Sequence, residues 1–338
     1  MSSSEIVFRC AFCGRDGWGH VTRCSALAYA FREKGWRTLL WTQSDATTLP
    51  KEVASAFDEA VSDLRPKSAS GGRIALCIDE MYTSDEELAS VAKRWKAANP
   101  AGVALGIDDM QQRRMYAFDL VINTEIGLRS ANYAPPRQLL GERYALLRSG
   151  FRESAQPAEW ALDSGQQAVF IMIGGTDPFG YAAKTLEALS LVDPDRLAPV
   201  VLLGSMKPDT ALRSALNTFR SSRVLQRLDS RQVAAWMRRC SFGIIGCGTT
   251  PYEAAAMQLP FVGLCLVDNQ RATAKKIEAS WGLPIIYREN CHDAPLDLSE
   301  AIAVLFRRIE RTFYAEVDGG GSRRIVDAVE AILAEAKQ

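Results

Sequence analysis

Short apolar segments alternate with longer segments of helical periodicity along the whole chain. In its first part, strands are expected at residues 6–10, 37–41, 74–78, 103–107 and 120–122. Helices are expected between them, at residues 21–34, around 51–60 and at 84–98. Strands and helices in this order predict a mostly parallel sheet with helices on both of its faces.

The same alternation begins again after residues 148–167, a polar segment with proline and glycine that we interpret as a domain linker. Strands are expected at residues 168–173, 199–203, 223–226, 242–245, 261–265 and 284–287, with helices at 181–191, 210–219, 230–240, 251–257 and 271–280 and two more at the end. We therefore expect an α/β fold of two Rossmann-like domains, at residues 1–150 and 165–320. Both would face a ligand-binding cleft with the carboxyl ends of their strands.

Composition agrees with this size and limits the partners. A chain of 338 residues is too long for one hydrophobic core, which favours two domains. The 40 Lys and Arg residues balance the 40 Asp and Glu residues, so no attraction to nucleic acid or to an anionic membrane is expected. No apolar segment approaches the roughly 20 residues that cross a bilayer, and the first residues do not resemble a signal peptide. We expect a cytoplasmic protein with neither nucleic acid nor membrane as partner.

The sequence contains 8 cysteines, which raises the question of a metal site. Cys10 and Cys13 form a CxxC motif, but no second pair follows at zinc spacing. Several others lie in apolar segments, where a thiol is typically a small buried hydrophobic group. We expect no metal, and we note Cys10, Cys13 and Cys24 as neighbours of the site.

A glycine-rich loop with a histidine follows the first expected strand. Its glycines Gly14, Gly17 and Gly19 have neither the G-x-G-x-x-G spacing of dinucleotide-binding loops nor the Lys-Ser/Thr of a P-loop. His20, one of 2 histidines, would stand at the start of the next helix, where the helix dipole favours a neutral imidazole that can accept a proton. The alternative is a histidine that only caps the helix or fills space. His292, in a polar loop, is interpreted as structural.

Two further glycine turns follow strands of the second domain. One is Gly174-Gly175-Thr176-Asp177, and the other is Gly246-Cys247-Gly248-Thr249-Thr250-Pro251. Amide groups at such helix starts bind phosphates without a metal. Glu253, one turn into its helix, would accept hydrogen bonds from a ribose or a base. Each turn alone can be a routine strand–helix connection, but together with the histidine loop they predict a nucleotide-sugar site.

The segment Gly17-Trp18-Gly19-His20-Val21-Thr22-Arg23 resembles the G-x-G-H-x-x-R element of the nucleotide-sugar hydrolases of pseudaminic acid biosynthesis. Further matches follow in the same order as in that family: Ile78-Asp79, Ile107-Asp108-Asp109, Val121-Ile122-Asn123, the segment 141–148, Gly174-Gly175-Thr176-Asp177, Glu253 and Asp268-Asn269-Gln270. The resemblance covers residues 6 to about 280. It implies a GT-B-like fold of the MurG type, with a helix at residues 321–338 that packs back on the N-terminal domain.

Members of that family release UDP from UDP-2,4-diacetamido-2,4,6-trideoxy-β-L-altropyranose. For this chain the resemblance implies that water releases the nucleotide from a nucleotide-activated amino or deoxy sugar, a UDP-sugar above all, without a cofactor. We expect His20 to act as general base, with Asp79 or Asp16 as orienting group. The residues expected on the nucleotide are Gly174, Gly175, Thr176, Gly248, Thr249, Thr250 and Glu253. Those expected near the sugar or the phosphates are Gly17, Gly19, Arg23, Tyr82, Asn269 and Gln270.

The chain departs from the family pattern mainly in residues that we assign to the sugar side. Ala11 stands where the family usually has Asp, Glu80-Met81 interrupts its Asp-His-Tyr pattern, and Phe179 or Gly180 replaces a polar residue. We expect Glu80 and Met81 to influence which sugar is bound. A glycosyltransferase that uses a nucleotide-sugar donor is the alternative function, and a non-catalytic binding protein is the third.

Overall fold

The computed structural model describes residues 4–10, 12, 18–63, 73–109, 111, 113–151, 156–174, 177, 179–204, 207–288, 294–307 and 316–336. Among the expected site residues, Asp16, Gly17, Gly175 and Thr176 lie outside this part of the chain. The chain divides into two compact units, Met1–Ser149 with Gly319–Gln338 and Gly150–Asp318.

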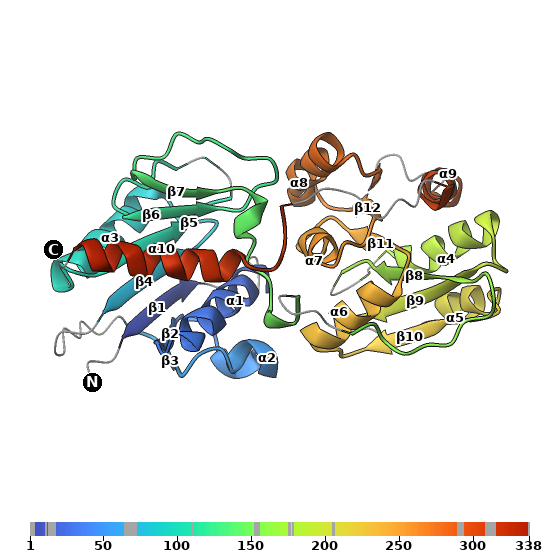
Figure 1. Cartoon of the computed structure of the whole chain (residues 1–338), viewed down its shortest axis with the longest axis horizontal. Coiled ribbons are helices and arrows are strands. Elements are labelled where there is room, and N and C mark those ends of the chain that lie inside the picture. The colour runs from blue at the N-terminus through green and yellow to red at the C-terminus, as the bar shows by residue number, and fades with distance from the viewer. Residues whose placement is uncertain are drawn as a thin grey trace. The chain divides into compact units, whose positions relative to one another are not determined.

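The first unit is built on a parallel sheet with the strand order β3-β2-β1-β4-β5-β6-β7. These strands are β1 (Glu5–Cys10), β2 (Arg37–Trp41), β3 (Glu59–Val61), β4 (Ile74–Asp79), β5 (Val103–Ile107), β6 (Leu120–Asn123) and β7 (Arg137–Leu140). Its helices include α1 (Gly19–Glu33), α2 (Lys51–Ala54), α3 (Asp85–Ala98) and α10 (Gly321–Glu335). Helix α10, drawn in red in Figure 1, comes from the end of the chain and packs against α1.

The second unit has a parallel sheet with the strand order β10-β9-β8-β11-β12-β13. These strands are β8 (Gln167–Met172), β9 (Leu197–Leu203), β10 (Arg223–Gln226), β11 (Phe242–Gly246), β12 (Phe261–Cys265) and β13 (Ile285–Tyr287). The helices are α4 (Tyr181–Val192), α5 (Thr210–Leu216), α6 (Ser230–Arg239), α7 (Thr250–Ala256), α8 (Arg271–Lys276) and α9 (Ala294–Arg307), and a π-helical turn (Ile277–Trp281) continues α8 (Figure 1).

Strand β1 shows why the central strands contain consecutive apolar residues. Ile6 and Phe8 pack with residues of α1 and α10 on one face of the sheet. Val7, between them, packs with residues of α3 on the other face. A strand covered on both faces has no place for alternating polar residues.

Each sheet has one point at which the strand order reverses. In the first unit this switch point lies between β1 and β4, and in the second unit between β8 and β11. Doubly wound sheets bind ligands beyond the carboxyl ends of the strands that flank such a point. The residues that follow β1, β4, β8 and β11 are therefore the first to consider as site residues.

The structure confirms the expected central strands and corrects the prediction at both edges of the first sheet. Residues 51–60 do not form one helix, because α2 ends at Ala54 and the edge strand β3 follows. Strand β7, at the opposite edge, was not predicted. Edge strands have one neighbour and remain partly exposed, so they lack the continuous apolar pattern that identifies the central strands.

Candidate active site

His20 and Asp79 meet at the switch point of the first unit. His20 lies in the first turn of α1, which follows β1, and Asp79 is the last residue of β4. The Nδ1 atom of His20 lies 2.8 Å from Oδ1 of Asp79, whose side chain is almost completely buried. The structure thus brings together two of the three residues predicted to act in catalysis, His20 and Asp79.

The partners of Nδ1 determine which tautomer His20 adopts. Nδ1 also lies 3.1 Å from a guanidinium nitrogen of Arg23, which can only donate a hydrogen bond. Because the contact to Asp79 is shorter and its carboxylate can only accept, we assign the proton to Nδ1. Nε2 then carries the lone pair, and within the described part of the chain it has no hydrogen-bond partner.

Arg23 joins the dyad to a second carboxylate. Its Nε and one terminal nitrogen donate to both oxygens of Asp79, each at 2.5 Å. The other terminal nitrogen donates to Asp109, which lies two residues beyond β5 and has a partly exposed side chain. Two carboxylates on one guanidinium leave the group with one negative charge while His20 is neutral, and with none after His20 takes up a proton.

The pKa values follow from this arrangement. Burial raises the pKa of Asp79, but Arg23 and His20 lower it more, so it lies well below its usual range. Burial lowers the pKa of His20, but the hydrogen bond and the charge of Asp79 raise it more, and it lies above its ordinary value of 6.5. The sequence led us to expect a lowered His20 pKa at the helix start. The net shift is upward, because Asp79 raises the pKa more.

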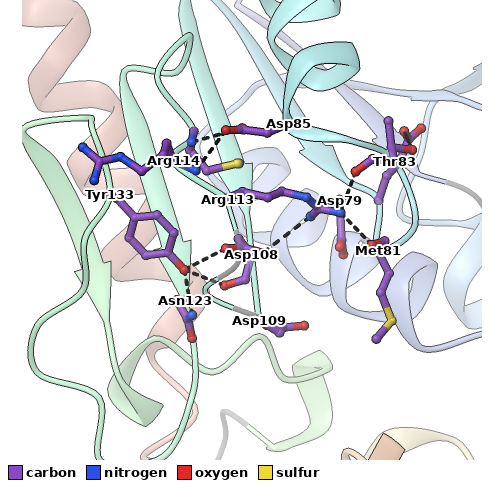
Figure 2. Close-up of polar contacts among 12 residues, drawn as sticks. Asp79, Met81, Thr83, Asp85, Asp108, Asp109, Arg113, Arg114, Asn123 and Tyr133 are labelled. Atoms are coloured by element: carbon purple, nitrogen blue, oxygen red, sulfur yellow. Dashed lines mark hydrogen bonds and ion pairs between the residues drawn. The ribbon is translucent and has the colours of Figure 1, made fainter.

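A polar network supports the loops beside this dyad (Figure 2). Arg113 donates to the carbonyl oxygens of Met81 and Thr83, and more distantly to the buried carboxylate of Asp108 at 3.5 Å. Tyr133 donates to Asp108 at 3.0 Å and accepts from Asn123 at 2.9 Å. These bonds fix the loop that follows β4 and the residue next to Asp109.

The loop after β4 also carries Tyr82 and Glu80. Tyr82, expected near the sugar, exposes 47% of its surface. Glu80 accepts from Arg9 at 2.7 Å and from Thr83 at 2.8 Å, with 12% of its side chain exposed. Arg9 in turn stacks over the ring of Trp41. Glu80 therefore holds the loop to the sheet, and its influence on the choice of sugar stays a prediction.

The described cysteines are buried, as expected of small hydrophobic residues: Cys10, Cys24, Cys77, Cys240, Cys247 and Cys265. Cys13 lies outside the described residues. The Sγ atom of Cys24 donates to Asp79 at 3.7 Å, so this buried thiol contacts the carboxylate of the dyad. Among the residues that the structure describes, no group of three or more His, Cys, Asp or Glu side chains could hold a metal ion.

The second unit brings its predicted residues to the switch point between β8 and β11. A side chain on Gly246 would come within 2.2 Å of the carbonyl oxygen of Ile173, so the two strand ends approach each other closely. Gly248 and Thr249 are exposed, and Thr250 begins α7. Glu253 lies within α7 and is buried. The Nε2 atom of Gln270 lies 3.8 Å from the Cβ position of Gly248, and Asn269 beside it is exposed.

Asp177, the last residue of the expected phosphate segment Gly174-Gly175-Thr176-Asp177, caps the start of α4. Both oxygens of Asp177 accept hydrogen bonds from backbone amides there, at 2.8 Å from Tyr181 and 2.7 Å from Ala182. A phosphate at this helix start would lie against the Asp177 carboxylate. Gly174 is described and partly exposed, and the two residues after it lie outside the described part of the chain.

Sequence reasoning did not assign a role to Asp109 or Arg113. Asp109 carried a signal, because it follows β5 at the edge of the sheet that also presents His20 and Asp79. Arg113 lies in a loop, and nothing in its local sequence indicates what it contacts.

Comparisons with known proteins agree on the fold. No family model matches the chain. The spore coat polysaccharide biosynthesis protein SpsG of Bacillus subtilis is 23% identical over 267 residues, which cover 77% of this chain and 76% of SpsG. MurG of Acinetobacter baumannii has a TM-score of 0.62 at 11% identity and covers 97% of this chain and 99% of its own. UGT2 of Phytolacca americana, complexed with UDP-2-fluoro-glucose and pterostilbene, has a TM-score of 0.57 at 10% identity. The match covers 100% of this chain and 95% of UGT2.

These likenesses extend over almost the whole length of both solved structures, and each unit of this chain is a doubly wound parallel sheet. No helix among the described residues is both long and apolar enough to cross a membrane. The chain has a GT-B-like fold.

Proposed function

We propose that the chain hydrolyses a nucleotide-activated sugar, a UDP-sugar above all, in the biosynthesis of a glycan. Water attacks the anomeric carbon, and the nucleoside diphosphate leaves. The observation that carries this proposal is the His20–Asp79 dyad, whose Nε2 has no partner among the described residues. The match to SpsG supports a role in polysaccharide biosynthesis, and the UDP-sugar in the UGT2 complex supports the class of substrate.

In this mechanism each residue of the dyad has a separate role. His20 removes a proton from the attacking water through Nε2, which is general-base catalysis. Asp79 holds the ring by its Nδ1–H and stabilises the imidazolium that forms, as the carboxylate does in a Ser-His-Asp triad. Arg23 keeps Asp79 ionised and in place. Attack opposite to the leaving diphosphate inverts the anomeric centre.

The nucleotide is assigned to the second unit. Gly248, Thr249, Thr250 and Gln270 gather at its switch point, and Glu253 and Asn269 are close to them in sequence. Gly19, Arg23 and Tyr82 in the first unit are assigned to the sugar side. Because Asp177 occupies the start of α4, we place the diphosphate nearer to the turn at Gly248.

A glycosyltransferase is the second candidate. The same dyad would then deprotonate an acceptor hydroxyl in place of water. The UGT2 structure, which holds UDP-2-fluoro-glucose together with pterostilbene, favours this alternative. The pseudaminic acid hydrolases, which the sequence resembles, favour water. The chemistry at His20 is the same in both cases.

The test is the release of UDP from a panel of UDP-sugars by the purified chain in ¹⁸O-labelled water. Hydrolysis at the anomeric carbon puts the label on the sugar, whereas attack of water on the β-phosphorus puts it on the terminal phosphate of UDP. Release that occurs only after an acceptor is added, with no free sugar, establishes the transferase. A chain that binds UDP but releases none from any sugar, with or without acceptors, overturns both enzymatic proposals.

A further inference from the structure

Phe179 and Arg288 are brought together from distant parts of the second sheet. Phe179 comes after β8, and Arg288 directly follows β13. Strands β11 and β12 lie between β8 and β13, so the strands themselves are roughly 14 Å apart. Nevertheless the guanidinium of Arg288 lies 4.2 Å from the centre of the Phe179 ring. The helices that follow these two residues also pack on each other: α4 begins after Phe179, and α9 comes after Arg288.

Both residues are exposed, and the contact lies beyond the carboxyl ends of the strands that they follow. Phe179 exposes 42% of its surface, and its ring also contacts Tyr181 edge to face. The ammonium of Lys184 lies 4.6 Å from the Tyr181 ring. Two cations thus lie on two touching aromatic rings, next to the loop that flanks the switch point of this unit. Cation–π contacts orient a guanidinium and leave its N–H groups available.

Among the described residues, the two cations at this place have no ion pair. Within the part of the chain that the structure describes, neither Arg288 nor Lys184 has a carboxylate partner. The nearby Asp177 directs both of its oxygens to the amides of Tyr181 and Ala182. A planar guanidinium with free donors is the side chain best suited to bind two phosphate oxygens at once.

We propose that Arg288, held in position by the ring of Phe179, binds the diphosphate of the nucleotide in the second unit. This inference rests on the proposed function, which supplies the nucleoside diphosphate as ligand. The departing diphosphate gains negative charge as its bond to the sugar breaks, and a fixed cation stabilises that charge. Arg288 thereby serves both binding and departure of the leaving group, and Phe179 is its positioning residue.

The test is a calorimetric titration of UDP, UMP and uridine into Arg288→Met, in the presence of EDTA. These probes share base and ribose and differ in their phosphates. We expect about 10- to 100-fold weaker binding of UDP, a smaller loss for UMP, and unchanged binding of uridine. The matched control is Arg223→Met, because Arg223 is also an exposed arginine over an aromatic ring, that of Trp160, but lies on the edge strand β10. It should bind UDP like the unmodified chain.

Three outcomes are distinguishable. If the unmodified chain binds neither UDP nor any UDP-sugar, the proposed function fails, independently of Arg288. If it binds UDP and Arg288→Met binds UDP equally well, the inference about Arg288 is overturned while the proposed function stands. If UDP and uridine weaken by the same factor, Arg288 supports the base or the fold, and the diphosphate contact is overturned.

Phe179 provides a second, independent measurement. Phe179→Leu keeps an apolar side chain but removes the ring that orients Arg288, so UDP binding should weaken by several-fold. Phe179→Tyr retains the ring and should restore the affinity. Equal losses of UDP affinity in Leu and Tyr variants would contradict the positioning role. The affinity for UDP should also fall as the salt concentration rises, and more weakly so in Arg288→Met, because one charge contact has been removed.

Discussion

His20 Nδ1 and Asp79 Oδ1 lie 2.8 Å apart although 59 residues separate them in sequence. The contact crosses the switch point between β1 and β4, so the topology of the sheet itself aligns base and carboxylate. For this reason His20→Asn should reduce kcat by about 10²- to 10⁴-fold, the usual cost of losing a general base. Its affinity for UDP should not change, because the nucleotide residues belong to the second unit. The other histidine gives the control, His292→Asn, which should remain active.

The raised pKa of His20 predicts how activity and stability depend on pH. The base works only when neutral, so kcat/KM should rise with pH through a pKa above 6.5. The folded state binds the imidazole proton of His20 more tightly than the unfolded state does. The stabilisation from His20 is therefore fully present below the unfolded pKa and is lost as pH rises through the folded pKa. The His292→Asn variant retains a single histidine, so its NMR titration measures the pKa of His20 in the folded state directly. A value below 6.5 would contradict the assigned role of Asp79.

Asp109 should act on His20 through Arg23. It offsets the positive charge of Arg23, which otherwise lowers the pKa of the imidazole. Asp109→Asn should therefore lower the pKa of His20 and move the rise of kcat/KM to lower pH. The matched control is Glu59→Gln, which removes a carboxylate paired with Arg37 at the far edge of the same sheet. The NMR titration should show no shift in that variant, and equal shifts in both variants would mean a general charge effect.

Glu80 should matter for stability more than for the choice of sugar. Glu80→Ala removes hydrogen bonds to Arg9 and Thr83, and we expect the free energy of unfolding to fall by about 1–3 kcal/mol. Glu80→Gln keeps the shape and can still accept from Thr83, so its loss should be smaller. Urea unfolding measures both. If Glu80→Ala retains full stability but changes the order of preference among UDP-sugars, the sugar-side role expected from the sequence is right after all.

The sequence predicted the central strands of both sheets because burial on both faces makes most of their positions apolar. It also predicted that His20 stands at the start of a helix and that a turn at Gly248 precedes another, because glycine turns after such strands are visible as a pattern. Edge strands β3 and β7 were missed since they are short and partly exposed. Ion pairs were not predictable: Arg9 with Glu80 and Arg23 with Asp109 depend on the order of strands in the sheet. The effect of Arg23 and Asp109 on the pKa of His20 could therefore be recognised only in the structure.

Gly246, the last residue of β11, and Gly248, two residues beyond it, should respond differently to substitution: the first in stability, the second in UDP binding. A Cβ on Gly246 would lie 2.2 Å from the carbonyl oxygen of Ile173, a distance that forces the backbone to move. Gly246→Ala should therefore destabilise the second unit by about 1–3 kcal/mol. Among the described residues, a Cβ on Gly248 would meet only Nε2 of Gln270, at an ordinary 3.8 Å, so Gly248→Ala should fold normally.

Gly248→Ala should nevertheless bind UDP about tenfold more weakly, because a methyl group keeps the phosphates away from the backbone amides. Thermal unfolding and UDP titration of both variants make the comparison. If Gly248→Ala binds UDP as tightly as the unmodified chain, the diphosphate does not approach this turn. If UDP affinity then falls in Arg288→Met, the diphosphate lies beside Arg288 and Phe179, on the β13 side of the second sheet. If UDP affinity falls in neither variant, the diphosphate does not bind at the carboxyl ends of these strands.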